Sequence, residues 1–160
     1  MSSRFSGVWV LDPTRSEAPN VHLASLGLGD LAQSAATRIN ATVSLRIALR
    51  GSELNLVHCS SLGEKDRRIT LGDPIFETGR DGTPIRLVTD AASQLVLRTQ
   101  IDYGKARIFE IKTLASPDTL IQEVTMTLRG NITRTTRHFM RTTLSEMASA
   151  SAAAAAASFD

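Results

Sequence analysis

A positive charge within the last patterned segment is the feature of this sequence with the clearest chemical consequence. Residues 131–141 alternate so that Thr133, Thr135, Arg137 and Phe139 share one face of a strand. If that face points into a protein interior, the arginine needs a buried anion or a carboxylate partner, because an unpaired charge is costly to bury. An inward-facing Arg137 would therefore indicate a bound anion or a buried carboxylate partner.

Other reactive residue types form no recognisable catalytic or metal-binding pattern. His22, His58 and His138 are dispersed, and His58 and Cys59 are neighbours that point to opposite faces of a strand. The sequence has no nucleophile elbow, no phosphate-binding loop and no residues with metal-ligand spacing. We therefore expect no enzymatic activity, no catalytic residues, no metal and no cofactor.

The composition fits one soluble domain. Of 160 residues, 42% are hydrophobic and 21% are charged, which is normal for a globular protein. A net charge of +2 and only 4% aromatic residues argue against a nucleic-acid-binding surface. Cys59 is the one cysteine, which excludes an internal disulfide and fits a reducing compartment. With no signal-peptide pattern and no stretch long enough to span a membrane, the chain is expected in the cytoplasm.

Short strand patterns separated by turn residues recur along the chain. Residues 43–50 alternate with a period of two, and Asp81-Gly82 is the strongest hairpin signal. Other turns are expected at 63–66 and 90–93. This spacing indicates an up-and-down sandwich or barrel. The ten expected strands are 5–12, 43–50, 54–58, 68–71, 75–78, 83–89, 94–101, 107–114, 119–127 and 131–141.

Two segments depart from the strand pattern. Residues 16–38 indicate two short helices, with Ser16 as the N-cap of the first and Gly27 and Gly29 between them. Their apolar side chains would close one end of a barrel. Residues 142–160 are rich in alanine and lack an amphipathic pattern, so we expect a partly helical tail after a barrel domain at 1–141.

The order of motifs over residues 4–141 also carries a family resemblance. The segment begins with Phe5-x-Gly7-x-Trp9-x-Leu11, Ser16-Glu17 and Ser25-Leu26-Gly27-Leu28-Gly29, and continues with Leu71-Gly72, Phe76-Glu77-Thr78, Gly104-Lys105 and Thr136-Arg137-His138-Phe139. In this order the motifs resemble the cytosolic fatty-acid-binding and retinoid-binding protein family of the calycin group. The resemblance implies a mostly β fold, a ten-stranded antiparallel up-and-down β-clam barrel with a water-filled cavity, capped by a helix-turn-helix lid.

The resemblance further implies a set of ligand-binding positions. Arg137 and Phe139 match the final-strand arginine and aromatic residue that contact the ligand carboxylate in that family. Lys112 falls at a second basic position, although its local alternation does not settle which face is inward. Gln100 could reach the cavity or face solvent. Leu62 matches an apolar portal residue, and simple turn packing explains it equally well.

The function implied by the resemblance is intracellular binding and transport of fatty acids or similar hydrophobic carboxylates. The carrier is expected to be a monomer, with at most transient membrane contact and no nucleic-acid partner. Two alternatives stay open: a non-enzymatic barrel adapted to protein interaction, and a lipocalin-like carrier of another small hydrophobic molecule.

Overall fold

The computed structural model describes residues 3–16, 42–60, 63–79 and 82–142. The predicted helical lid lies outside these ranges except for Ser16, and the alanine-rich tail lies outside them except for Thr142. Leu62, expected at a portal turn, is also outside the described residues. Within the described ranges every regular element is a β-strand, and none is a helix.

The ten strands predicted from the sequence form one antiparallel sheet. Consecutive strands pair, apart from β4 and β5, and the first strand also pairs with the last. The sheet order is therefore β4-β3-β2-β1-β10-β9-β8-β7-β6-β5. The strands are β1 (Gly7–Asp12), β2 (Thr42–Arg50), β3 (Glu53–Ser60), β4 (Gly63–Thr70), β5 (Ile75–Thr78), β6 (Pro84–Ser93), β7 (Val96–Tyr103), β8 (Ala106–Ser116), β9 (Thr119–Leu128) and β10 (Asn131–Thr142).

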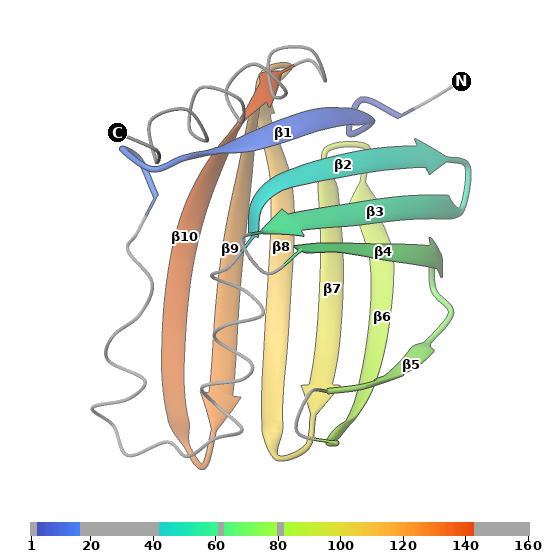
Figure 1. Cartoon of the computed structure of the whole chain (residues 1–160), viewed down its shortest axis with the longest axis vertical. Helices are drawn as coiled ribbons and strands as arrows, with labels where there is room; N and C mark the ends of the chain where they lie inside the picture. Colours follow the sequence, from blue (N-terminus) through green and yellow to red (C-terminus); the bar gives the residue numbers. More distant parts are fainter. Residues whose placement is uncertain (1–2, 17–41, 61–62, 80–81, 143–160) are drawn as a thin grey trace.

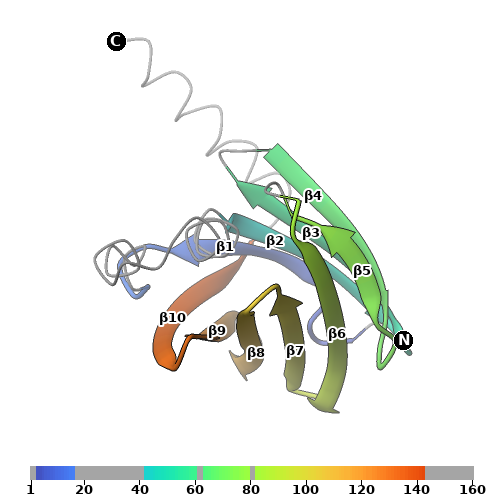
Figure 2. The same cartoon turned by 90° about the horizontal axis from the view of Figure 1, so that it is seen from below.

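The sheet wraps around its own inner face. In Figure 1, β1–β5 cross in front of β6–β10, and Figure 2 shows the two halves facing each other across the interior. Pairing of β1 with β10 and of β5 with β6 joins the halves. No backbone pairing joins β4 to β5 in the part of the chain that the structure describes. The result is a nearly closed barrel with one seam between these two strands.

Two predicted turns are wrong. Residues 63–66 form the first half of β4, where Asp66 pairs with Val57 of β3. Residues 90–93 lie in β6, at a bulge near its end. Both segments are largely exposed and consist of charged or small residues, which makes them look like turns in the sequence. Charged side chains are common on strands that border an opening in a sheet, because they discourage pairing with other chains.

The inner face of the sheet is mainly apolar. The largest fully buried side chains are Trp9 of β1, Phe139 of β10 and Phe5, which lies in the turn before β1; Trp9 Nε1 donates a hydrogen bond to the carbonyl oxygen of Phe5 at 3.0 Å. On β10 the predicted alternation is confirmed, since Arg137 is buried whereas Arg134 is exposed. The other fully buried large side chains are Leu45, Ile69, Ile85, Ile108 and Leu120.

Arg141 ties the N-terminal segment to the end of β10. Its guanidinium carbon lies 4.3 Å from the centre of the Trp9 ring, within cation–π range. The same guanidinium donates hydrogen bonds to the carbonyl oxygens of Arg4, Ser6 and Pro117, each at 2.8 Å. These bonds hold the start of the chain across one end of the sheet.

A methyl group at position 7 is expected to disturb this arrangement. Gly7 has a φ of 152°, and a Cβ there would overlap the guanidinium of Arg141. We predict that Gly7→Ala lowers the free energy of unfolding by about 1–3 kcal/mol, through backbone strain and loss of Arg141 hydrogen bonds. Urea denaturation measures the change. Gly130→Ala is the control, because Gly130 also has a positive φ but has open space around it. An equal loss in both variants would rule out the collision with Arg141.

Candidate functional site

A row of polar side chains crosses the inner face of β8, β9 and β10. Lys112 pairs in register with Gln122, and Gln122 pairs with Arg137. Each of the three residues is only 3% exposed. Residues directly opposite in an antiparallel sheet have Cβ atoms about 5 Å apart. The Gln122 amide therefore lies between an amine and a guanidinium on a buried surface.

A second polar row lies next to the first. Glu110 and Thr135 are both buried, on either side of Val124. The row continues through Thr99 and Thr89, whose hydroxyl oxygens are 2.9 Å apart. Together the two rows form what we call the polar band, which consists of Thr89, Thr99, Glu110, Lys112, Gln122, Thr135 and Arg137.

Apolar rows border the polar band on both sides. Leu114, Leu120 and Phe139 pair across the strands on one side, and Ile108 and Met126 pair on the other. All five are buried. A molecule placed along this face would meet charge and hydrogen-bonding groups at the band and hydrocarbon beyond it. The arrangement suits an amphiphile with one polar group and an apolar remainder.

Arg137 brings a stable positive charge to the inner face. Its guanidinium carbon lies 5.7 Å from the centre of the Phe139 ring, again within cation–π range. Burial lowers the pKa of Arg137 from its ordinary value. An arginine nevertheless stays protonated at neutral pH, so the charge is present under physiological conditions. A planar guanidinium at this place can bind both oxygens of a carboxylate.

Lys112 has a different electrostatic environment. Its ammonium forms an ion pair with the carboxylate of Glu110, two residues away on the same face of β8. Burial, and to a smaller extent the positive charge of Arg67 on β4, lowers the pKa of Lys112 from 10.5 to about 7. Near neutral pH this side chain is therefore divided between its charged and neutral forms.

The lowered pKa of Lys112 predicts a pH dependence of stability. Below pH 7 the lysine is protonated in both the folded and the unfolded chain, and its contribution does not change with pH. Between about pH 7 and 10.5 the unfolded chain still holds a proton that the folded chain has released. Raising the pH through this window therefore favours the folded chain, by at most about 1.4 kcal/mol per pH unit.

Urea denaturation at pH 7, 8 and 9 checks this effect by comparing the protein with Lys112→Met. The charged groups around the amine are Glu110, Arg67 and Arg137, and all three are kept in the variant. The wild-type free energy of unfolding should rise with pH relative to the variant. Lys105→Met serves as the control, because Lys105 is exposed. Parallel pH profiles for the wild type and Lys112→Met would contradict the burial of a titrating amine.

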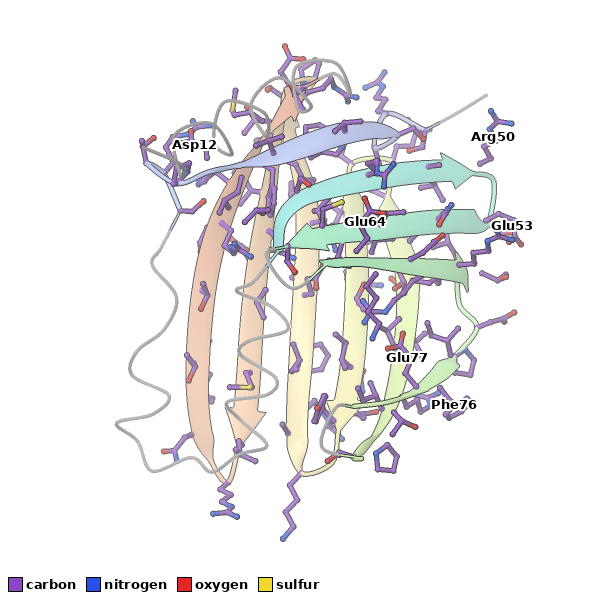
Figure 3. All side chains as sticks on the ribbon, viewed as in Figure 1. Asp12, Arg50, Glu53, Glu64, Phe76 and Glu77 are labelled. Atoms are coloured by element: carbon purple, nitrogen blue, oxygen red, sulfur yellow. The ribbon has the colours of Figure 1, made fainter. Side chains whose placement is uncertain are left out.

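Ion pairs close the seam between β4 and β5. Arg67 of β4 donates to both carboxylate oxygens of Glu77 on β5, with Nη2 to Oε2 at 3.2 Å. Lys65 Nζ lies 3.0 Å from the same Oε2. Figure 3 shows Glu77 on the side of β5 that faces β4, where it bridges the gap that backbone pairing leaves. The side chains of Arg67 and Glu77 are 7% and 17% exposed.

Three of the five residues predicted to contact a ligand share the inner face. Arg137 and Lys112 lie in the polar band, and Phe139 lies in the apolar row beside it. Gln100 lies on the outer face of β7, where its Nε2 is 3.5 Å from the carboxylate of Asp102, so we leave it out of the candidate site. Leu62 is outside the described residues.

Sequence reasoning missed three polar residues near this site: Glu110, Gln122 and Arg67. Gln122 could have been found, because the tight turn between β9 and β10 sets a register in which it faces Arg137. Glu110 follows from Lys112 by strand alternation, once the inward face of β8 is known. Arg67 has no such signal, because it approaches Lys112 across the interior from a distant strand.

Other kinds of site were searched for in the described ranges. No group of three or more His, Cys, Asp or Glu residues there could hold a metal ion. The same ranges contain no helix that is long and apolar enough to cross a membrane.

Comparison with proteins of known structure identifies the fold of this chain. No family model matches the sequence, and no curated protein sequence matches it. Among solved structures, the Schistosoma mansoni fatty acid binding protein in complex with arachidonic acid matches with a TM-score of 0.65 and 18% identity, over 88% of this chain and 98% of that chain. The chain has the fold of the fatty-acid-binding proteins.

Two further structures support the same fold. The fatty-acid-binding protein from the brain of Drosophila melanogaster has a TM-score of 0.62 and 18% identity, over 85% of this chain and 98% of that one. The Echinococcus granulosus fatty-acid-binding protein 1 has a TM-score of 0.61 and 15% identity, over 86% of this chain and 97% of that one. At these identities the fatty-acid-binding-protein fold is shared, and the ligand must be argued from the side chains of this chain.

Proposed function

We propose that this protein binds a long-chain fatty acid, or a similar hydrophobic carboxylate, against the inner face of its sheet. The ligand carboxylate lies at the polar band and its hydrocarbon lies along the bordering apolar rows. The observation that carries the proposal is the row of Lys112, Gln122 and Arg137, in which two basic side chains flank an amide on a buried surface.

The three side chains of this row offer complementary interactions. Arg137 can donate two parallel hydrogen bonds to a carboxylate, whereas Lys112 offers a point charge. Gln122 Oε1 is buried and, among the described residues, lacks a hydrogen-bond partner. A buried polar atom of this kind is costly unless a ligand group or water satisfies it. A carboxylate accompanied by an ordered water would satisfy all three residues.

Phe139 limits how the head group is recognised. It lies two residues after Arg137 on the same face and has no hydroxyl group to donate to a carboxylate. Direct bidentate recognition therefore depends on Arg137. The aromatic ring packs beside the guanidinium and contributes to holding its plane in place.

Hydrophobic transfer supplies most of the binding energy in this proposal. Burial of a methylene group is worth roughly 0.8 kcal/mol, so a chain of about sixteen carbons gains on the order of 12 kcal/mol. Association costs of roughly 4–15 kcal/mol oppose this gain. A charge-assisted hydrogen bond adds about 1.5–3 kcal/mol. The hydrocarbon thus sets the affinity, and Arg137 sets the orientation of the ligand.

The proposal is that of a carrier and includes no catalytic step. The structural neighbours support it through their own ligands, since the Schistosoma mansoni protein was solved with arachidonic acid bound. The single cysteine fits a carrier that works in the reducing cytoplasm. We propose that the carrier is monomeric, contacts membranes at most transiently and has no nucleic-acid partner.

Native mass spectrometry of the freshly purified protein tests the proposal. We expect mass adducts that match fatty acids and that disappear after delipidation, and we expect added oleate to restore a one-to-one complex. A protein without co-purified lipid that also fails to bind added oleate would contradict the proposal. That outcome would favour a barrel used for protein interaction.

A further inference from the structure

Lys112 is a primary amine whose surroundings favour reaction as well as charge pairing. It is 3% exposed, lies opposite Leu97 and Gln122 in the sheet, and has a carboxylate beside it at Glu110. Arg137 supplies the bidentate donor for a carboxylate, whereas Lys112 brings an amine that can also take part in a second chemistry. Amines that are desolvated, or placed near a second cation, are the ones that act as nucleophiles towards carbonyl groups. Both conditions hold at this position, since Arg67 is the nearby cation.

We propose that Lys112 captures long-chain aliphatic aldehydes by forming an imine inside the barrel. The inference rests on the proposed function, because the aldehyde must enter along the same inner face as a fatty acid. Its hydrocarbon would lie against the apolar rows, which include Leu114 and Leu120. Its carbonyl group would then replace the carboxylate at the polar band, within reach of the Lys112 amine.

The reaction balances without any further reagent. The lone pair of Nζ attacks the carbonyl carbon, a C–N bond forms, and the C=O π electrons move to oxygen. A proton passes from nitrogen to that oxygen, which gives a carbinolamine. The nitrogen then loses its second proton, the hydroxyl group leaves as water, and the C=N bond forms. The Glu110 carboxylate is placed to accept the proton from Nζ and to return it to the departing hydroxyl.

Lys112 should be far more reactive at neutral pH than an ordinary lysine. With a pKa of about 7, roughly half of its amine is free at pH 7. At an ordinary lysine the free fraction is about one part in a few thousand. The chain has three lysines, and the other two, Lys65 and Lys105, are exposed. These two residues serve as internal controls for reactivity.

Reductive trapping tests the inference. The full-length protein is incubated with hexadecanal and sodium cyanoborohydride at pH 7, and peptide mapping locates the adduct. We expect a mass increase equal to the aldehyde less one oxygen atom, at least about tenfold more abundant at Lys112 than at Lys65 or Lys105. Excess palmitate should suppress labelling at Lys112 and leave labelling at Lys65 unchanged. Equal labelling at all three lysines, or labelling of Lys112 that palmitate does not affect, would overturn the inference.

A variant separates this inference from the proposed function. Lys112→Arg cannot form an imine and should lose the adduct, whereas Lys105→Arg, at an exposed lysine outside the site, should keep the Lys112 adduct and bind a fluorescent fatty acid as the wild type does. Oleate binding by the wild-type protein without a Lys112 adduct would refute aldehyde capture and leave the proposed function intact. Failure of both oleate and hexadecanal to bind would refute the proposed function as well.

Discussion

Replacing Arg137 with alanine is expected to weaken fatty-acid binding about tenfold to a hundredfold without abolishing it. The substitution removes a charge-assisted hydrogen bond to the ligand carboxylate, worth about 1.5–3 kcal/mol. It leaves the apolar rows that hold the hydrocarbon, so measurable affinity should persist. Titration with a fluorescent fatty acid, followed by displacement with oleate, gives the two dissociation constants.

Arg134→Ala is the matched control for this substitution. Arg134 lies three residues earlier on the same strand but is exposed on the outer face, whereas Arg137 is buried. Its removal changes the net charge equally and should leave affinity within about twofold, because exposed charges at this distance are screened. Equal weakening by the two variants would point to a non-specific electrostatic effect. Unchanged affinity in Arg137→Ala would remove this residue from the candidate site.

Replacing Glu77 with alanine is expected to lower the free energy of unfolding by about 3–5 kcal/mol, because it leaves a buried guanidinium without its carboxylate. Arg67 is 7% exposed and takes both oxygens of Glu77. Glu77 also receives Lys65, so its loss leaves two positive charges side by side at the seam. Denaturation by urea, with circular dichroism to confirm that the variant is folded, measures the change.

The control for this prediction is Asp90→Ala. Asp90 pairs with Arg98 at 3.0 Å, but both side chains are more than half exposed. Exposed pairs of this kind are typically worth about 0.2–1 kcal/mol. Double-mutant cycles with Arg67→Ala and Arg98→Ala then give the coupling energy of each pair. A coupling across the seam no larger than that of the exposed pair would show that side chains do not hold β4 to β5.

The fold was predictable from the sequence because strand alternation and turn residues are local signals. On β10 strand alternation puts Arg137 and Arg134 on opposite faces, and in the structure Arg137 is buried and Arg134 is exposed. The same signals failed at 63–66 and 90–93, where charged and small residues continue a strand. Charged residues in these segments indicate exposure to solvent. Turns and strand edges are both exposed, so charge does not distinguish between them.

The candidate site was only partly predictable. The face on which Lys112 lies was ambiguous, because β8 buries charged residues and exposes an aromatic one. Glu110 and Lys112 are buried, whereas Phe109 is 44% exposed. The bulge near the end of β8 also shifts its register with β9, so pairing could not be counted back from the turn. The contribution of Arg67 to the electrostatics of Lys112 depends on the curvature of the whole sheet, which no local pattern contains.

The most direct test of the central claim is nuclear magnetic resonance of a bound fatty acid labelled with ¹³C at its carboxyl carbon. A carboxylate held at the polar band by Arg137 should give one distinct bound resonance. The chemical shift of that resonance should show that the bound carboxyl group stays ionised to a lower pH than the free acid does. In Arg137→Ala this stabilisation of the ionised form should be lost. A bound carboxyl group that titrates like the free acid in the wild-type protein would show that the head group faces solvent, and would contradict the account.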